Sequence, residues 1–341
     1  MKLALHRHVL RLRHPFGISR GTKTSQETVI VTLTLDGITG AGEATPNLYY
    51  GTTTAGIVES IEAQRDWFTG RDDESPEALW TELAARIDDP FALCALDEAI
   101  WDLHGKRRGR SLRELWNLTD GEGPPSSYTI ALAEPAAMVR RLHEAPDWPV
   151  YKIKLGRPDD LELLRALRAE TNAPFRVDAN AGWTLDEARR RLEDLVALDV
   201  ELVEQPLAAS DVEGMRTLRA ESPLPLVADE SCRDERDLDA CAELFHGINV
   251  KLMKCGGPTP ALRLLRRARA LGLRTMVGCM TESSVGVAPI AQMLPLLDWV
   301  DMDGPALCAN DLAEGLRFER GHPVLAARAA GNGVRYLAPA D

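Results

Sequence analysis

At 341 residues, the chain is long enough for two domains, or for one barrel with an accessory domain. Hydrophobic residues make up 45% of it, and no apolar stretch is long enough to span a bilayer. The net charge of −12 argues against general binding to nucleic acid or to an anionic membrane, because such binding needs clustered Lys and Arg. The six cysteines are dispersed without a CxxC pair and the first residues do not read as a secretory signal, so we expect a cytoplasmic protein.

The first part of the chain, residues 1–120, is predicted to form an α+β domain. Period-two alternation and β-branched residues indicate strands over residues 1–46, with a hairpin turn at Asp36 and Gly37. Apolar residues at helical spacing follow in three stretches, 53–68, 75–87 and 90–109. Strands followed by helices, without alternation between them, are typical of an α+β domain.

From residue 121 to residue 318 strand patterns alternate with amphipathic helical patterns. The strand-like runs are SYTIAL, YKIKLG, FRVDAN, LVEQP, PLVADE, INVKL, RTMVGCM and WVDMD. Eight strands with intervening helices indicate a (β/α) barrel of the TIM type. The competing doubly wound sheet would carry a GxGxxG loop after its first strand, and none is present. We expect the tail, about 319–341, to pack back toward the first domain.

Ionisable residues end successive strands of the predicted barrel at a nearly constant interval. Steps of 24, 26, 25 and 22 residues separate Lys154, Asp178, Glu204, Asp229 and Lys251. Each step is about one strand plus one helix. Because the C-terminal ends of barrel strands meet at one mouth, these side chains are predicted to form a single site.

Three of these residues, Asp178, Glu204 and Asp229, are carboxylates on consecutive strands. Neighbouring strands lie about 4.8 Å apart, so the three side chains can share one ion. Oxygen ligands without His or Cys favour Mg²⁺, with Mn²⁺ as an alternative. Asn180 lies on the same strand face as Asp178 and could steady the carboxylates. The alternative, that these are solvated loop residues or helix caps, would leave three like charges at one mouth without a counter-ion.

Lysines are predicted on both sides of the carboxylates. Lys152 and Lys154 share one strand face, and two adjacent ammonium groups should pull at least one pKa toward neutrality, as a general base requires. Lys251 arrives from the far side, so one lysine could remove a proton from a carbon and the other could return one to the opposite face. Lys254 should face away if its strand continues, which suggests a structural role. The alternatives are a surface KxK strand and a salt bridge from Lys251 to a carboxylate.

Taken together, these residues resemble the enolase superfamily, specifically its muconate lactonizing subgroup, over nearly the whole chain. The matching signature is a KxK pair, then Asp, Glu and Asp, then Lys. The resemblance implies a modified (β/α)7β barrel with an N-terminal α+β capping domain. It also implies Mg²⁺-dependent removal of a proton α to a carboxylate, with the ion stabilising the enediolate.

Within the subgroup the chain resembles the dipeptide epimerases, which invert the C-terminal α-carbon of a dipeptide by 1,1-proton transfer. In that family a DxD pair, here Asp301 and Asp303, holds the free ammonium group. The resemblance also implies that Thr129 and Cys279 contact the substrate and that Lys152 adds positive charge beside its carboxylate. L-Ala-D/L-Glu is one candidate substrate.

Two segments of the first domain resemble the family's lid loops, 14–26 and 46–53. In the first, Gly17 and Gly21 flank Arg20, and such a loop can close on a ligand. The resemblance implies that Arg20 meets a side-chain carboxylate of the substrate, and such a pair is geometrically selective. A solvent-facing Arg20 is the alternative, and nearby His14 or Lys23 could alter the preference.

Other functions share parts of this pattern. N-succinylamino acid racemase, o-succinylbenzoate synthase and muconate cycloisomerase use the same metal site but need no ammonium-binding pair. A Schiff-base aldolase would use Lys154 or Lys251, and a ligand-binding barrel without catalysis would leave the opposed lysines unexplained. Superfamily barrels often form symmetric homo-oligomers, although no feature of the sequence gives the number of subunits.

Overall fold

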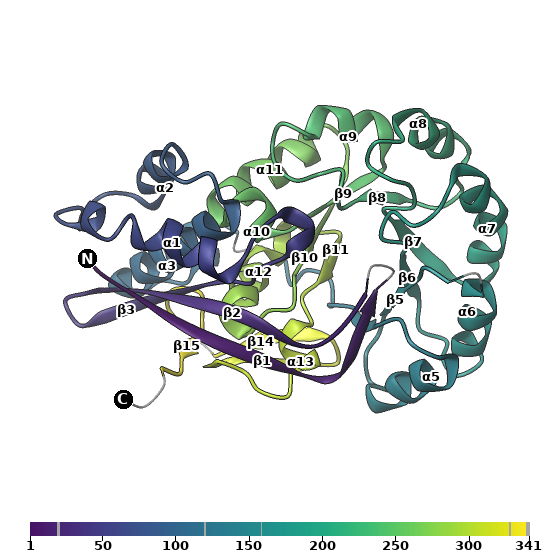
Figure 1. The fold of residues 1–341 in the computed structure, drawn as a ribbon, viewed down its shortest axis with the longest axis horizontal. Helices are drawn as coiled ribbons and strands as arrows, with labels where there is room; N and C mark the ends of the chain where they lie inside the picture. Colours follow the sequence, from purple (N-terminus) through teal and green to yellow (C-terminus); the bar gives the residue numbers. More distant parts are fainter. Residues whose placement is uncertain (19–20, 119–120, 158, 327–328, 339–341) are drawn as a thin grey trace.

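An eight-stranded parallel sheet forms the larger part of the molecule (Figure 1). The computed structural model describes residues 1–18, 21–118, 121–157, 159–326 and 329–338. The strands of the sheet are β4 (Tyr128–Ile130), β5 (Tyr151–Lys154), β6 (Phe175–Asp178), β7 (Val200–Glu204), β8 (Leu226–Ala228), β9 (Gly247–Val250), β10 (Arg274–Gly278) and β11 (Trp299–Asp301). They lie in chain order, and a parallel bridge between Ser126 and Val300 brings the first and last strands together. The predicted barrel is confirmed.

Helices cover the outside of this sheet. They are α5 (Pro135–Glu144), α6 (Asp160–Arg168), α7 (Leu185–Ala197), α8 (Val212–Glu221), α9 (Leu238–Leu244), α11 (Pro258–Ala270) and α12 (Ser284–Met293). Two short helices, α10 (Leu252–Cys255) and α13 (Gly304–Leu307), contact the N-terminal part of the chain instead. Helix α7 illustrates how the sequence sets their ends, because Thr184 and Glu187 form a capping box at its first turn. Inside the barrel a separate apolar cluster fills the space, formed by Leu202, Val227, Met276 and Trp299.

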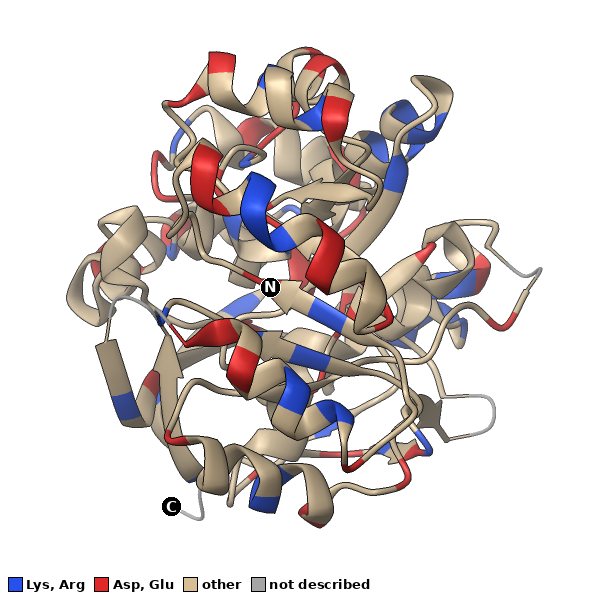
Figure 2. Cartoon of the chain, turned by 90° about the vertical axis from the view of Figure 1, so that its right-hand side faces the viewer, with Lys and Arg blue, Asp and Glu red and all other residues tan. Residues whose placement is uncertain are grey.

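Acidic and basic residues are interspersed on the outer helices (Figure 2). Several form pairs between neighbouring helices, such as Arg165 with Asp194 at 2.7 Å and Arg189 with Glu221 at 2.6 Å. The two signs are therefore mixed on this side of the molecule. No helix in the described part of the chain combines the length and hydropathy needed to cross a membrane.

The N-terminal part of the chain forms a three-stranded antiparallel sheet with helices packed on it. Its elements are β1 (Lys2–Ile18), β2 (Gly21–Leu35), β3 (Ile38–Ala44), η1 (Leu48–Tyr50), α1 (Thr54–Glu62), η2 (Asp66–Phe68), α2 (Pro76–Ala84), α3 (Pro90–Arg108) and α4 (Leu112–Leu115). Strands followed by helices agree with the α+β pattern expected for this region.

Buried hydrogen bonds join this N-terminal part to the barrel. On α3 the carboxylate of Asp97 accepts hydrogen bonds from the backbone nitrogen and the hydroxyl of Thr259, at 2.7 and 2.8 Å. On β3 the carboxylate of Glu43 accepts from the hydroxyl of Ser283 at 2.5 Å. All four residues are buried, so the two parts meet through satisfied polar groups as well as apolar packing.

The hairpin of β1 and β2 extends from the capping sheet to the barrel (Figure 1). The backbone nitrogen of Leu132, after β4, donates to the carbonyl oxygen of Gly17 at 2.9 Å. A Cβ on Gly17 would lie 2.2 Å from the carbonyl oxygen of Leu132, so only glycine permits this approach. Arg141 adds a bond from Nη2 to the carbonyl oxygen of Pro15 at 3.1 Å. The segment predicted as a loop is therefore largely strand, docked against the barrel.

The C-terminal segment contains two short strand pairs, β12 (Ala313–Glu314) with β15 (Arg335–Tyr336) and β13 (Leu316–Glu319) with β14 (His322–Leu325). It contacts the N-terminal part at several points. Asn332 donates from its backbone nitrogen to Asp102 on α3 at 2.9 Å, and Tyr336 lies 2.7 Å from His8 on β1. The division of the chain at residues 120 and 121 stays a prediction.

Candidate active site

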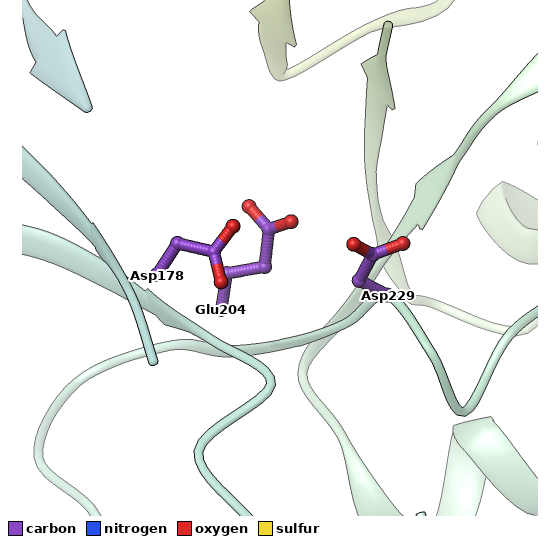
Figure 3. A group of neighbouring side chains, drawn as sticks. All are labelled: Asp178, Glu204 and Asp229. Carbon is purple, nitrogen blue, oxygen red and sulfur yellow. The ribbon is translucent and has the colours of Figure 1, made fainter. Parts of the chain in front are cut away.

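The carboxylates of Asp178, Glu204 and Asp229 point toward one another at the C-terminal ends of β6, β7 and β8 (Figure 3). One oxygen from each lies within 4.8 Å of the others, and all three residues are buried. The backbone nitrogen of Asn180 donates to Asp178 at 2.9 Å, because residue 180 has a left-handed φ of 45° that turns the chain back over the strand end. The sequence-based prediction of one shared acidic site is therefore met by the geometry.

Lys152 connects the triplet to the last strand of the barrel. Its Nζ lies 2.8 Å from Glu204, 3.3 Å from Asp178 and 2.7 Å from Asp301. Burial alone would lower the pKa of Lys152, but the three carboxylates outweigh burial and raise its pKa well above the usual value. This direction is the opposite of what a neighbouring ammonium group alone would give, because three carboxylates surround Lys152.

The other two lysines lie on opposite flanks of the triplet. On β5 the Nζ of Lys154 donates to Asp178 at 2.6 Å. After β9 the Nζ of Lys251 donates to Asp229 at 2.6 Å. Both lysines line the same cavity. Because β6, β7 and β8 separate their strands in the sheet, the two ammonium groups approach that cavity from two sides.

Lys254 also contacts the triplet, contrary to the expectation that it faces away. Strand β9 ends at Val250, and the short helix α10 turns Lys254 back so that its Nζ donates to Oδ1 of Asp229 at 2.6 Å. The same ammonium group donates to the carbonyl oxygen of Asn249 at 3.1 Å. Although burial opposes the charged form of Asp229, Lys251 and Lys254 together hold its pKa well below the usual range.

Two amides that sequence reasoning missed fix the carboxylates further. Nδ2 of Asn249 donates to Glu204 at 2.9 Å. Oε1 of Gln205 accepts from the backbone nitrogens of Asp229 and Ser231, both at 3.0 Å. Gln205 has a left-handed φ of 36°, which aims its side chain across to the next strand end. For Gln205 the available signal was an amide directly after the strand-end carboxylate Glu204.

Asp301 and Asp303 lie together beside the first strand of the barrel. The backbone nitrogen of Thr129 donates to Asp303 at 2.6 Å, and its hydroxyl lies 3.3 Å from an oxygen of each aspartate. Burial and the neighbouring Asp301 raise the pKa of Asp303 to about 8. For Asp301, Lys152 outweighs burial and lowers the pKa. Asp303 is thus a buried carboxyl group that a nearby cation would stabilise in its ionised form.

A cavity of about 540 Å³ joins these groups. From the barrel it is lined by the candidate catalytic residues Lys154 and Lys251, by Thr129 and by Cys279, which directly follows β10. From the N-terminal part it is lined by the hairpin residues Phe16 and Lys23 and by Tyr50 of η1. The two segments that resemble the family's lid loops, 14–26 and 46–53, both contribute to this lining. Arg20 lies outside the described residues.

The acidic triplet suits a hard divalent cation. Its donors are carboxylate oxygens without His or Cys, which is the ligand set of Mg²⁺. Burial and the neighbouring Asp178 raise the pKa of Glu204 to about 7, so the third carboxylate is poorly accommodated as an anion until a cation offsets its neighbours. The residues present therefore fit the ion that the sequence predicted.

Two family models together match nearly the whole chain. Residues 2–116 match the mandelate racemase / muconate lactonizing enzyme N-terminal domain, and residues 134–338 match the enolase C-terminal domain-like family. Two curated relatives are L-Ala-D/L-amino acid epimerases. The protein from Flavobacterium johnsoniae is 46% identical over 94% of this chain and 96% of its own length. The protein from a Maribacter species is 45% identical over 98% and 99%.

A solved structure gives the same picture. The dipeptide epimerase from Methylococcus capsulatus, crystallised with Mg and the dipeptide L-Arg-D-Lys, superposes with a TM-score of 0.91 at 32% identity, covering 98% of this chain and 100% of that one. The fold, the acidic triplet on successive strand ends and the flanking lysines all lie within the matched region. The chain belongs to the enolase superfamily, in the mandelate racemase and muconate lactonizing enzyme family.

Proposed function

We propose that this protein is a Mg²⁺-dependent dipeptide epimerase that inverts the C-terminal α-carbon of a dipeptide. The observation that carries the proposal is the placement of Lys154 and Lys251 on opposite flanks of the buried acidic triplet. Inversion by proton transfer needs one group that removes a proton from one face of the carbon and another that supplies a proton to the other face. The related epimerases and the dipeptide-bound neighbour support the same substrate class.

Asp178, Glu204 and Asp229 would hold the ion, and the dipeptide carboxylate would lie against it. When bound, Mg²⁺ supplies the positive charge that makes the adjacent α-proton acidic enough to remove. Lys152 adds its own positive charge beside the triplet, held there by Asp301 at 2.7 Å. One lysine of the flanking pair takes the α-proton, and the other lysine donates a proton from the opposite side.

Asp303 and Asp301 bind the ammonium group of the N-terminal residue. Both are buried, and the backbone nitrogen and hydroxyl of Thr129 orient them. An ammonium group beside Asp303 restores the ionised form that burial disfavours. N-succinylamino acids lack this cation and would place an acyl group against two carboxyl groups. The DxD pair therefore favours free dipeptides over the substrates of N-succinylamino acid racemase.

The decisive measurement is α-proton exchange in D₂O. We expect the wild-type protein with Mg²⁺ to place deuterium on the C-terminal α-carbon of Ala-X dipeptides, read by mass spectrometry and proton NMR. The double variant Lys154→Ala with Lys251→Ala should lose exchange altogether, while the exposed Lys2→Ala serves as the matched control. Thermal melts with and without Mg²⁺ verify that the double variant is folded.

Exchange at the wild-type rate in the folded double variant would exclude the two-base scheme. A preference for N-acylated amino acids over free dipeptides would instead identify a racemase of the same superfamily. Trapping of a substrate carbonyl by borohydride, with activity that survives a chelator, would identify a Schiff-base enzyme.

The cellular setting is a further part of the proposal. We place the protein in the cytoplasm as a homo-oligomer. All six cysteines are free, five of them buried, which suits a reducing compartment. Size-exclusion chromatography with light scattering measures the number of subunits, and a monomer at micromolar concentration would contradict the assembly.

A further inference from the structure

The hairpin of β1 and β2 brings one more ammonium group into the wall of the active-site cavity, that of Lys23. Lys23 stands opposite Phe16 in the register of the hairpin, and both residues line the cavity. Nζ of Lys23 lies 6.0 Å from the centre of the Phe16 ring. This lysine therefore faces the cavity from the capping sheet, whereas the lysines that contact the acidic triplet belong to the barrel.

A neutral side chain holds this ammonium group in place. Nζ of Lys23 donates to Oε1 of Gln26 at 2.5 Å. Nε2 of Gln26 donates to the carbonyl oxygens of Glu27 and Pro46, at 3.0 and 3.1 Å, so the amide is oriented with its oxygen toward the lysine. Within the described ranges no carboxylate oxygen lies within 4.0 Å of this Nζ. The positive charge is positioned without being neutralised.

The cavity's other lysines differ in this respect. Lys152, Lys154 and Lys251 each contact at least one carboxylate at 2.8 Å or less. Lys23 is half-buried, and burial, with the positive charge of Lys154 acting in the same direction, lowers its pKa to about 8. A substrate anion beside Lys23 would offset both effects, and a hydrogen bond between two charged groups is stronger than one to a neutral amide.

We propose that Lys23 binds a carboxylate on a side chain of the dipeptide and thereby gives the enzyme a preference for acidic substrates over their uncharged isosteres. This inference rests on the proposed function, since it assigns the side-chain specificity of the same site. The carboxylate could belong to the C-terminal or to the N-terminal residue, and the chemistry of recognition is the same for both.

The test compares substrates of equal shape and different charge. The ratio of kcat/KM is measured for Ala-Glu against Ala-Gln, and for Glu-Ala against Gln-Ala, in wild type, Lys23→Met and Lys23→Arg. We expect wild type to prefer the acidic member of one pair by about 10- to 100-fold. Lys23→Met should bring that ratio close to one, and Lys23→Arg should keep most of it. The pair that responds shows which residue carries the carboxylate.

Two further variants separate charge recognition from damage to the hairpin. Gln26→Glu places a carboxylate beside Lys23, so the acid preference should fall although the lysine remains. Thr24→Val changes an exposed neighbour outside the cavity lining and should keep the wild-type ratio.

Four outcomes would overturn the inference. The first is a kcat/KM ratio near one for both substrate pairs in wild type, and the second is an unchanged ratio in Lys23→Met. The third is a loss of the acid preference in Thr24→Val. The fourth is a loss of the acid preference in Arg20→Met while Lys23→Met keeps it. In each of these cases epimerisation of the neutral dipeptides still supports the proposed function. Absence of exchange with every dipeptide would remove the proposed function itself.

Discussion

Lys254 holds Oδ1 of Asp229 from behind the acidic triplet, through a hydrogen bond of 2.6 Å between two buried side chains. The Nζ of Lys251 donates to Oδ2, the other oxygen of the same carboxylate, also at 2.6 Å. The two lysines therefore have different roles although they lie three residues apart. Lys251 lines the cavity, whereas Lys254 does not and instead fixes the direction of the Asp229 carboxylate.

The first prediction concerns this positioning lysine. Lys254→Met keeps the length of the side chain and removes its donors, so Asp229 loses one of its two anchors. We expect activity at saturating Mg²⁺ to fall about 10- to 100-fold, as is typical when a partner of a metal ligand is removed. Titration of activity with Mg²⁺ should also show a changed half-saturating concentration. The control is Arg236→Met in an exposed ion pair with Asp234. A wild-type kcat and Mg²⁺ dependence in Lys254→Met would contradict the role.

The second prediction concerns recognition of the substrate ammonium group. Asp303→Asn keeps the shape of the side chain and its contact with Thr129, but loses the negative charge. Loss of one partner from a buried charge pair costs about 2–5 kcal/mol, so kcat/KM for free dipeptides should fall about 30-fold or more. N-acetylated dipeptides lack the ammonium group and should be affected much less. Equal losses for both kinds of substrate would mean that Asp303 does not bind the ammonium group.

The third prediction is a dependence of stability on pH. Burial, with the nearby Glu43, raises the pKa of Glu282 from its usual 4.5 to about 8 in the folded protein. The folded state therefore binds more protons than the unfolded state between these values, and stability contributed by Glu282 falls as pH rises from about 4.5 to about 8. Glu282→Gln removes this dependence. The free energy of unfolding of the variant, taken relative to that of wild type, should therefore be higher at pH 9 than at pH 5. The expected change in this difference is on the order of 3–5 kcal/mol.

Urea unfolding at both pH values measures that difference, with Mg²⁺ held constant. The control is Glu59→Gln on the solvent side of α1, which should shift stability equally at the two pH values. A constant difference between wild type and Glu282→Gln across the pH range would show that Glu282 is ionised throughout.

The fourth prediction concerns docking of the hairpin. In Gly17→Ala the added Cβ would meet the carbonyl oxygen of Leu132 at 2.2 Å, so the hairpin must move away from the barrel. Overpacking of this kind costs about 1–3 kcal/mol, and KM for dipeptides should rise about fivefold or more because the cavity loses part of its wall. Thr24→Ala on the same hairpin is the matched control. An unchanged KM in Gly17→Ala would show that the docked hairpin does not help to close the site.

Much of this site could be predicted because its residues follow the repeat of the barrel. A strand-end position determines where a side chain points, so Asp178, Glu204 and Asp229 could be placed together from spacing alone. The same argument located Lys154 and Lys251 on the two flanks.

The residues that were missed depend on local departures from the strand pattern. Lys254 faces the site because a one-turn helix begins at Leu252, and Gln205 does so because its φ is 36°. Neither departure is encoded by hydrophobic periodicity. The pKa of Lys152 could not be judged from the KxK pair, since it depends on three carboxylates that come from other strands of the barrel. The lid was predicted as a loop because its glycines suggested mobility, whereas Gly17 serves a close backbone contact.

The seam between the capping sheet and the barrel has a consequence for how this enzyme can diversify. Asp97 and Glu43 each supply acceptors whose donors, on Thr259 and Ser283, belong to the other side. If relatives exchanged whole capping domains, these buried carboxylates would lose their hydrogen-bond donors unless Thr259 and Ser283 were exchanged as well. The far end of the hairpin contains none of these four residues, so substitutions there need not disturb their hydrogen bonds. New substrate preferences should therefore arise by small changes at that tip, more readily than by recombination of whole domains.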